Sequence, residues 1–511
     1  MLRRLARPGK SVATRFREPP WNRQSPDWQA IDAFLPDDHV AKRISKGVDE
    51  ADLSELEESY QGQGERPYPP KLMLKAILYE IYQGRQSPAQ WHRDARENIV
   101  MKWLLLGCRP VRSRWYAIRE RLAPWLDRLN AWILHQAVAA GVTPAKQASL
   151  DGTLIASGAS RHQLANESKL QKRCEALQRA VADDESLVSP PTVPAWMAKR
   201  PAARLRQYQR YQVAQRRMAE LQAENSSRIP SRRRERNKIV LSVSDPEAAL
   251  GLDKHKVFRP LYNAQYARDL DSPLILGYQV FAQSSDAGTY ESMLDRVTQF
   301  TGRKLEQALA DAGYATAVNL AVSERRGVTL YAPWQENDFT PAAKKPSQES
   351  QLPKSAFAWQ PESQTYRCPA GKELKYVGRE TRQRAGDENT VYLSYQSSRH
   401  DCLACSLSHR CVKNPSQGRR VRRNEHEELI EAHQQRMQTP EAKQLYRQRK
   451  QTVELAFADS KQHRGLRRIS GYGLTKARLQ TGLTVLVHNL LTLQSALRPT
   501  QRNESNNPSG P

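Results

Sequence analysis

The chain has 511 residues, of which 39% are hydrophobic and 26% charged, enough for a sizeable core and about three domains. No stretch approaches the ~18 consecutive apolar residues of a membrane-spanning helix, which excludes an integral membrane protein. Lys and Arg number 80 against 54 Asp and Glu, a net charge of +26. Such a field attracts polyanions, and nucleic acid is the commonest large one. The alternative, a charge that serves only solubility, suits a much smaller surplus.

The two ends of the chain have the composition of unfolded segments. The Arg-rich start, MLRRLARPGKSVATRFREPP, lacks the apolar segment of a secretory signal. A transit peptide fits its composition, but a flexible basic arm over residues 1–25 is the favoured prediction. Residues 497–511 are polar and predicted to be disordered.

Residues 26–145 are predicted to form a helical N-terminal domain. Pro69–Pro70 precedes an apolar stripe at helical spacing, which Gly84 ends. Ser87–Pro88 supplies a cap and a first-turn proline for the next helix. A further stripe runs from Leu122 to Ile133. The basic segment RPVRSRWYAIRERL could dock on DNA, and a solvated charged face is an equally good interpretation.

Strand patterns begin at QASLDGTLIAS, residues 147–157, and are then interrupted by a polar insertion over residues 160–237. Between Lys199 and Lys238 there are 13 Lys and Arg against 3 Asp and Glu. A basic helical hairpin between strands fits this pattern, with a solvated arm that binds nothing as the alternative. Three of its cations, Arg232, Arg233 and Arg234, are predicted to contact DNA phosphates.

The remaining elements follow in an ordered series. Strands are predicted over residues 238–245, 257–267 and 273–285, and Asp286 is expected to cap a helix. A strand ending at LADAGYAT, a helix and the strand 327–333 come next. Residues 337–437 are predicted to be an irregular, cysteine-bearing insertion. A helix starts at Thr439–Pro440–Glu441 and is expected to run to about His463, before a final apolar helix.

Without the insertions, this order is that of a ribonuclease-H-like fold, a mixed α/β catalytic core over residues 146–496 with helices on both faces. Asp151 on the first strand, Asp311 after the fourth and Glu454 on the late helix can converge at one sheet edge. Carboxylates of this kind hold two Mg²⁺ ions about 3.5–4 Å apart for phosphoryl transfer. The alternatives are turn-forming aspartates and an ordinary salt bridge of Glu454 with Lys450. Other acids, namely Asp286, Asp295 and Asp459, are interpreted as caps or surface residues that activity does not need.

The helix that carries Glu454 is rich in cations. Arg447, Arg449, Lys450 and Lys461 surround the acid in YRQRKQTVELAFADSK, and Lys450, Glu454 and Lys461 are expected on one helical face. A basic helix around one metal-binding acid would clamp phosphates beside the reacting bond.

These residues carry a resemblance that covers nearly the whole chain. The motifs DGTLIAS, SDPEAAL, LYNAQYA, ADAGYAT and YRQRKQTVELAFADSKQHRGLRR, in this order, resemble a bacterial insertion-sequence transposase of the DDE superfamily. The resemblance is to the group whose third acid lies in a Tyr-Arg…Glu…Lys helix. It assigns the catalytic acids to Asp151, Asp311 and Glu454. Leu455 departs from the Arg that relatives often carry, and the segment Pro110–Arg119 matches the N-terminal pattern poorly.

The resemblance implies an enzyme that binds element ends, cleaves DNA and transfers the strand to a target. It implies two Mg²⁺ ions, with Mn²⁺ as a substitute, double-stranded DNA at terminal inverted repeats and target sites, a homodimer that holds two ends together, and a cytoplasmic, nucleoid-associated location. The alternatives are a ribonuclease-H-like nuclease that does not join, and a catalytically silent DNA-binding regulator.

The six cysteines leave a smaller question open. Cys368, Cys402, Cys405 and Cys411 include one CxxC pair, which together could hold a structural Zn²⁺. Free thiols are the alternative, and His409 could replace one cysteine. Cys108 is interpreted as a core residue and Cys174 as a surface thiol. His488, in a leucine stripe, is interpreted as a hydrogen-bonded core histidine rather than a catalytic one.

Overall fold

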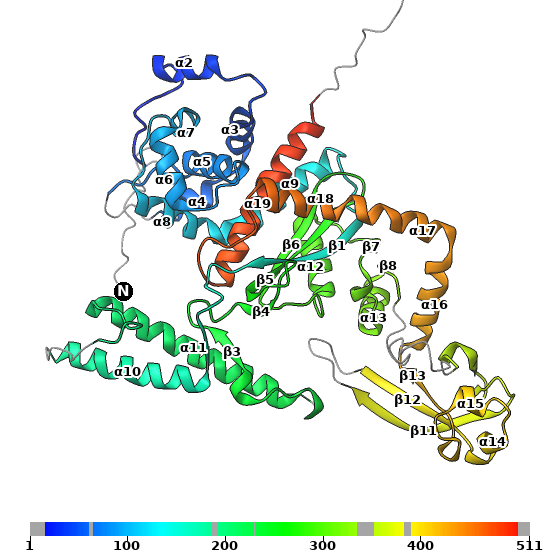
Figure 1. Ribbon diagram of the computed structural model, residues 1–511. Helices are drawn as coiled ribbons and strands as arrows, with labels where there is room; N and C mark the ends of the chain where they lie inside the picture. Colours follow the sequence, from blue (N-terminus) through cyan, green and yellow to red (C-terminus); the bar gives the residue numbers. More distant parts are fainter. Residues whose placement is uncertain are drawn as a thin grey trace, which may run out of the picture.

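The computed structural model describes residues 16–60, 65–186, 193–228, 230–334, 352–382 and 390–498. Its N-terminal part is a cluster of helices (Figure 1). These are α2 (Pro26–Phe34), α3 (Val40–Glu50), α4 (Ser54–Glu58), α5 (Pro70–Tyr82), α6 (Pro88–Glu97), α7 (Ile99–Leu104), α8 (Arg112–Leu122) and α9 (Leu126–Ala139). The predicted helix starts are confirmed, since Pro70 opens α5 and the Ser87 hydroxyl accepts a hydrogen bond from Ala89 N.

The chain ahead of α2 is more ordered than expected. Phe16 is buried, and the backbone N–H groups of Arg17 and Trp21 donate to the carbonyls of Pro67 and Leu106. The prediction of a flexible arm through residue 25 is therefore wrong for residues 16–21, because an apolar side chain anchors this segment on the helices. Residues 1–15 and 499–511, where the rest of the arm and most of the tail were predicted, lie outside the described residues.

A mixed sheet forms the centre of the molecule. Strand β1 (Gln147–Ala156) pairs antiparallel with β5 (Phe258–Asp269), which pairs antiparallel with β6 (Ile275–Phe281). On its other side β1 pairs parallel with β7 (Gln307–Leu309), which pairs parallel with β8 (Thr329–Tyr331). The order β6-β5-β1-β7-β8 confirms the ribonuclease-H-like, mixed α/β fold, and β4 (Ala249–Leu252) adds to the edge of β5.

One predicted strand lies elsewhere. Within residues 238–245 only β3 (Val240–Ser242) is a strand, and it pairs with β2 (Leu164–Asn166) in a separate two-stranded sheet. The first strand of the central sheet is β1, as predicted from the position of Asp151. The hydrophobic pattern of β3 identifies a strand but not its partner, which is why the sequence assigned it to the wrong sheet.

Helices join the sheet to the N-terminal cluster. Helices α12 (Tyr290–Thr301) and α19 (Leu474–Ala496) pack on β6, and α13 (Ala317–Arg326) follows β7. Helix α19 also packs on α3, α5 and α9, so it lies between the two parts (Figure 1). Its Asn489 side chain bonds to both the N–H and the carbonyl of Ile275, at 2.9 Å each. In the described part of the chain, no helix is long and apolar enough to cross a membrane.

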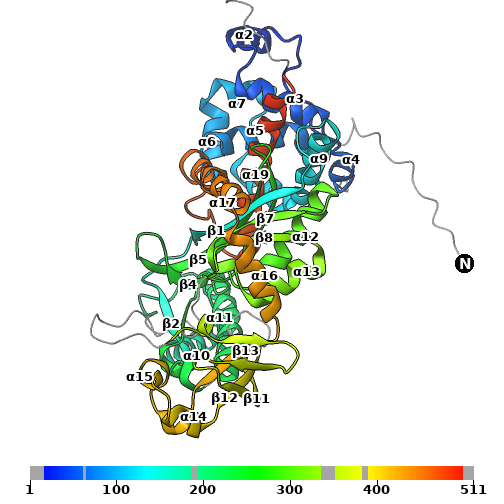
Figure 2. The same cartoon turned by 90° about the vertical axis from the view of Figure 1, so that its right-hand side faces the viewer.

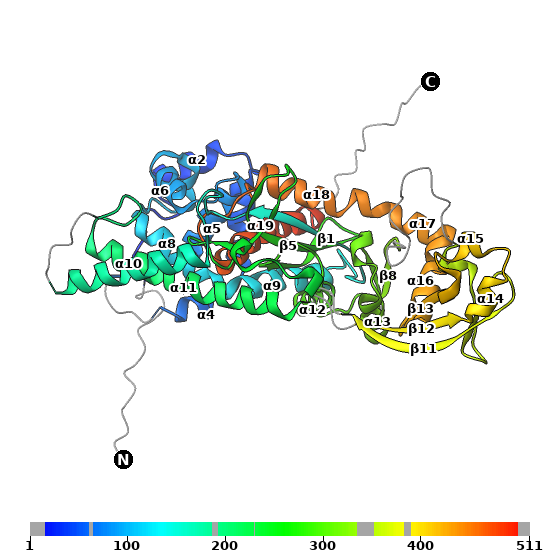
Figure 3. The same ribbon diagram turned by 60° about the horizontal axis from the view of Figure 1, so that its bottom comes forward.

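The first insertion is the predicted helical hairpin. Helices α10 (Glu167–Glu185) and α11 (Pro201–Ser227) pack on each other around a small core of their own. Cys174 belongs to that core and is buried, so its interpretation as a surface thiol is wrong. Figures 1 and 3 place this hairpin at one end of the molecule and the second insertion at the opposite end, while Figure 2 shows the N-terminal helices away from both.

The second insertion is a folded sheet rather than an irregular segment. Its antiparallel strands are β9 (Ala358–Gln360), β10 (Thr365–Arg367), β11 (Glu373–Arg382), β12 (Thr390–Ser397) and β13 (Arg420–Asn424). The rings of Trp359, Tyr366 and Tyr395 pack on one another, and the Arg423 guanidinium lies 4.1 Å from the Trp359 ring centroid. Aromatic packing across strands thus supplies a core that the polar composition concealed. Residues 337–351 of the predicted insertion lie outside the described residues.

The predicted helix from Thr439 to His463 is broken into pieces. Helix α16 (Glu427–Gln438) ends just before this segment. The Thr439 hydroxyl then caps α17 (Pro440–Arg447), as predicted. A 3₁₀ turn, η7 (Gln448–Gln451), separates α17 from α18 (Val453–Ala458), which a π turn, η8 (Asp459–His463), extends. Thr452, with φ −106° and ψ −82°, marks the break. Lys450, Glu454 and Lys461 therefore do not share one face of a continuous helix.

Candidate active site

Asp151 lies in the middle of β1, directly opposite Tyr266 of β5. Its side chain is 18% exposed, and the Gly152 N–H donates to its Oδ1 at 2.8 Å. Burial raises the pKa of Asp151 to about 6, although the charge of Arg449 and the Gly152 hydrogen bond act in the opposite direction. Two nearby carboxylates, Asp311 and Asp286, raise it further. A carboxylate held in this way is typical of a functional site.

Asp311 follows β7, the parallel neighbour of β1. It caps a single 3₁₀ turn, η4 (Ala312–Tyr314), where its Oδ1 accepts a hydrogen bond from Gly313 N at 2.8 Å. Parallel neighbouring strands end at the same edge of a sheet, and this pairing brings Asp311 within electrostatic range of Asp151. Two of the three predicted acids therefore lie near each other.

Asp286 is an acid that the sequence reasoning misread. The N-cap of α12 is Thr289, so Asp286 does not cap this helix as expected. Its Oδ1 instead accepts hydrogen bonds from Asn263 Nδ2 at 2.7 Å and Gln265 Nε2 at 2.5 Å. A Cβ atom at position 152 would collide with the Gln265 and Asp286 side chains, so Gly152 makes room for them. The glycine directly after Asp151 was the available signal.

Asp286 supports strand β1 from the face of the sheet opposite to the one that carries the Asp151 side chain. Asp151 and Gly152 are consecutive in β1, so their Cβ directions point to opposite faces of the sheet. Gln265 lies opposite Gly152 and also accepts a hydrogen bond from the Tyr314 hydroxyl. Asp286 thus anchors a polar network behind the strand that carries Asp151.

Glu454 lies on α18, the short helix that packs on β1 and β5. One turn later on α18, Phe457 stacks on Tyr266, with ring centroids 4.7 Å apart. Because Tyr266 is opposite Asp151, α18 crosses the sheet at the level of that acid. The Glu454 side chain is exposed at the margin of the packed face.

The cations of this segment have different positions. Arg449 Nη2 lies 3.0 Å from Asp151 Oδ2, in an ion pair whose side chains are only 11% and 18% exposed. Arg447 is exposed, and the Lys450 side chain lies outside the described residues. Lys461 Nζ donates to Thr153 Oγ1 at 2.6 Å and to the Leu154 carbonyl at 2.9 Å. Burial lowers the pKa of Lys461 to about 8. The ammonium group of Lys461 thus fastens the π turn to β1.

Tyr446, in the last turn of α17, is a further side chain near the acids. Burial raises its pKa, and the charges of Asp311 and Asp151 raise it further although Arg449 opposes them. The Tyr446 phenol, at the end of α17, therefore lies within electrostatic range of the Asp151 and Asp311 carboxylates.

The sequence predicts two kinds of metal site, one for Mg²⁺ at the acids and one for Zn²⁺ at the cysteines. Among the described residues, no three Cys, His, Asp or Glu side chains are arranged to hold a metal ion. The Asp151 carboxylate is paired with the Arg449 guanidinium instead. The predicted Zn²⁺ site is not formed either. The thiols of Cys368, Cys402 and Cys405 lie close enough to influence the pKa of Cys411, which burial raises, but they do not form a tetrahedral set.

The remaining single-residue predictions are settled by contacts. Cys108 is a buried core residue. His488 Nε2 lies 2.9 Å from the Pro273 carbonyl and its Nδ1 lies 3.3 Å from Asp459 Oδ2. It is therefore a hydrogen-bonded packing residue, as predicted. Asp295 is exposed and pairs with Arg326 at 3.0 Å.

The basic run at the end of the hairpin is exposed, but its arginines differ in their partners. Arg232, Arg233, Arg234 and Arg236 are all exposed, and Nε and Nη2 of Arg236 each donate to the Glu167 carboxylate at 2.7 Å. Arg236 therefore holds the end of the hairpin together, and the three arginines ahead of it remain available to a polyanion.

Comparisons with known proteins find transposase domains in two parts of the chain, and Asp151 and Asp311 lie outside both matches. Residues 29–114 match the family model described as a transposase domain (DUF772), and residues 367–494 match the model described as a transposase DDE domain. No curated protein and no solved structure matches the chain. The second match includes Glu454 and α18. Two transposase domains, in this order on one chain with a ribonuclease-H-like sheet, confirm the resemblance: the chain carries the domains of a transposase of the DDE superfamily.

Proposed function

We propose that this transposase binds the ends of an insertion sequence, cleaves the DNA in a metal-dependent reaction and transfers the freed strand to target DNA. The observation that carries the proposal is the pairing of β1 with β7. The proposal is supported because Asp311 lies within electrostatic range of Asp151, and because α18, the helix that bears Glu454, packs on β1. This is the order of acids expected for a phosphodiester-cleaving site on such a sheet.

The donor set fits divalent cations. Asp151 and Asp311 are hard oxygen ligands, and the charge of Asp311 contributes to the raised pKa of Asp151, an effect that a cation between them would relieve. We propose Asp151, Asp311 and Glu454 as the ligands of two Mg²⁺ ions, for which Mn²⁺ can substitute. Bound ions of this kind activate the attacking oxygen and stabilise the leaving one.

The side chains around the acids have roles of their own. Arg449 balances the charge of Asp151, and its planar guanidinium is equally suited to a phosphate once a cation takes that carboxylate. Arg447 is exposed on the same segment and can contact a second phosphate. Lys461 holds β1 against the π turn, which fixes the position of Asp151 relative to the segment that carries Glu454.

The reaction itself needs no covalent enzyme intermediate. Water attacks the phosphodiester in line, the P–O3′ bond breaks, and a 3′ hydroxyl and a 5′ phosphate result. The 3′ hydroxyl then attacks a phosphodiester of the target strand in the same geometry and displaces a 3′ hydroxyl of the target. Two ends must be held at once, and we propose a homodimer for this purpose. Catalysis is expected in the cytoplasm, at the nucleoid.

The decisive experiment follows a labelled element end in Mg²⁺, with separate measurements of binding, cleavage and joining to a plasmid. Terminal inverted repeats just outside the reading frame supply the substrate. Cleaved ends that join the plasmid would support the proposal. Cleavage without joining would favour the nuclease, and binding without cleavage would favour the silent regulator.

A further inference from the structure

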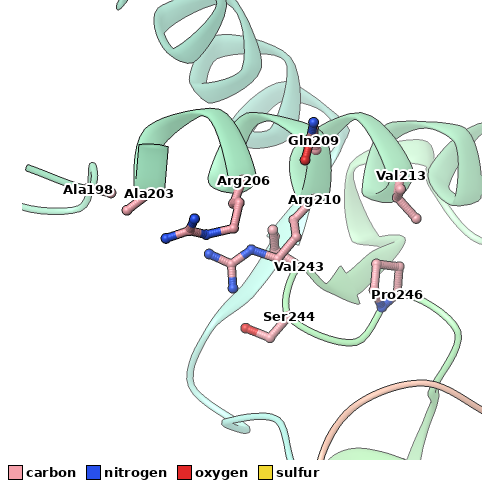
Figure 4. Close-up of a pocket in the computed structure, with 9 residues that line it drawn as sticks. All are labelled: Ala198, Ala203, Arg206, Gln209, Arg210, Val213, Val243, Ser244 and Pro246. Atoms are coloured by element: carbon pink, nitrogen blue, oxygen red, sulfur yellow. The ribbon is translucent and has the colours of Figure 1, made fainter. Parts of the chain in front are cut away.

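A pocket of about 590 Å³ opens where the helical hairpin meets the rest of the chain (Figure 4). One wall comes from α11 and the other from the segment after β3. The residues used below are Arg206, Arg210 and Val213 on the helix and Val243, Ser244 and Pro246 opposite them. Figure 4 shows the two guanidinium groups side by side, directed into the space above Ser244.

Helix α11 uses a different face for its own packing. The buried residues Arg204, Tyr211, Ala214 and Met218 are turned to the core of the hairpin. Arg206, Arg210 and Val213 follow at spacings of four and three, which places them on a second stripe. The pocket is therefore not a by-product of hairpin packing, because the hairpin core does not need these side chains.

Several arginines of the hairpin have carboxylate partners of their own. Arg204 pairs with Asp184, Arg217 with Glu220 and Glu224, and Arg236 with Glu167. Arg206 and Arg210 make no ion pair with any carboxylate in the described part of the chain. Two like charges one helical turn apart repel each other, so an external anion would stabilise this arrangement.

The other walls of the pocket are apolar. Val213 is 45% exposed, although it lies on a strongly charged helix, and it faces Val243 and Pro246 across the pocket. The Ser244 hydroxyl adds one polar group on the floor. A phosphodiester strand presents both features in turn, a charged phosphate and an apolar sugar edge. Guanidinium groups bind phosphate through paired, charge-assisted hydrogen bonds.

We propose that this pocket seats the phosphodiester backbone of a DNA strand bound along the hairpin. The inference rests on the proposed function, since it assumes that DNA is the partner. Arg206 and Arg210 bind successive phosphate oxygens, Ser244 donates one hydrogen bond, and the apolar wall packs on deoxyribose. Contacts of this kind position DNA but do not read its sequence.

The test compares two double variants of the full chain with the same loss of charge. Arg206→Gln/Arg210→Gln empties the pocket of cations. The control, Arg179→Gln/Arg216→Gln, removes two exposed arginines of the same hairpin that do not line the pocket. Equilibrium binding to a labelled element end and to an unrelated duplex is measured over a salt series without Mg²⁺, so that cleavage plays no part.

The slope of the logarithm of the binding constant against the logarithm of the salt concentration should become shallower in the pocket variant by up to ~1.8. This is about 0.9 for each lost phosphate contact and should be equal for both duplexes. The control should change the slope by less than half as much. Val213→Glu, which adds a carboxylate to the pocket and keeps both arginines, should weaken binding in the same way if the circular dichroism spectrum is unchanged. Equal slopes for the pocket variant and the control, or a loss confined to the element end, would overturn the inference and leave the proposed function standing. Failure of the unmutated protein to bind either duplex would overturn both.

Discussion

Arg449 Nη2 lies 3.0 Å from Asp151 Oδ2, and this ion pair joins the segment of the third acid to the strand of the first. The two residues are 298 positions apart (449 minus 151). Because the pair is largely buried, removing either charge leaves the other unpaired in the protein interior, which costs free energy. A cation that binds Asp151 would have to replace the guanidinium.

The first prediction measures this dependence. Arg449→Gln should lower the free energy of unfolding of the DNA-free protein by about 2 kcal/mol, because it leaves the buried Asp151 carboxylate unpaired. Asp151→Asn should lower it by less, because it also removes a carboxylate whose charge burial and the neighbouring acids already disfavour. The double variant should lose less than the sum of the two. Urea unfolding of the unmutated protein, the two single variants and the double variant gives the four free energies of this double-mutant cycle. The exposed pair of Arg325 with Glu291 serves as the control, for which a coupling below about 1 kcal/mol is expected. A purely additive double variant would contradict the dependence.

The second prediction concerns the chemistry. Asp311→Asn keeps the shape of the side chain but removes a charged ligand, so cleavage should fall about a hundredfold or more while DNA binding survives. Asp151→Asn and Glu454→Gln should behave alike, and combining the three should add little. Cleavage of a labelled element end in Mg²⁺ is measured beside binding. Near-normal cleavage by Asp311→Asn would refute the assignment of the acids.

The third prediction separates Asp286 from ordinary surface acids. Asp286→Asn keeps an oxygen acceptor but removes the negative charge that strengthens the hydrogen bonds from Asn263 and Gln265 behind β1, so cleavage should fall about tenfold to a hundredfold with the fold retained. The expectation from the sequence, that Asp286 is dispensable, is replaced by this one. Asp295→Asn is the matched control, since Asp295 is exposed on α12 and should keep most activity. Equal activities of the two variants would exclude a positioning role for Asp286.

The fourth prediction uses Glu80 of α5, whose side chain is fully buried. Burial, and after it a hydrogen bond with Asp94, raises the pKa of Glu80 to about 8 from 4.5, with Arg85 acting against them. The folded state therefore binds this proton more tightly than the unfolded state. Its contribution is complete below about pH 4.5 and is lost as the pH rises through about 8. Glu80→Gln should match the unmutated protein near pH 5 and be more stable near pH 9. Thermal melts across this range, with the exposed Glu97→Gln as the control, provide the measurement.

The fifth prediction concerns the exposed run Arg232, Arg233 and Arg234. Replacing all three with Gln should weaken DNA binding and lower the salt slope by up to ~2.7, about 0.9 for each phosphate contact. Arg236 is left unchanged because its loss would release Glu167 and disturb the hairpin end. A salt titration with an unchanged slope would show that this run does not touch DNA.

Local signals in the sequence were sufficient for much of the fold. The caps at Ser87 and Thr439 and the proline that opens α5 act within one helical turn, so their positions follow from neighbouring residues alone. The alternating strands and the basic hairpin also follow from short-range periodicity. Their order along the chain then indicated a ribonuclease-H-like sheet, and with it the neighbourhood of Asp151 and Asp311.

What the sequence by itself determined is therefore the order of the elements and the residues that end them. The tertiary structure alone decided which distant groups meet: Arg449 with Asp151, Phe457 with Tyr266, and Asp286 with the amides behind Gly152. It also decided that β3 leaves the central sheet and that the helix after Thr439 breaks at Thr452. The physical reason is that burial and partner choice depend on contacts between residues that are tens to hundreds of positions apart, for which a local pattern of polar and apolar residues carries no information.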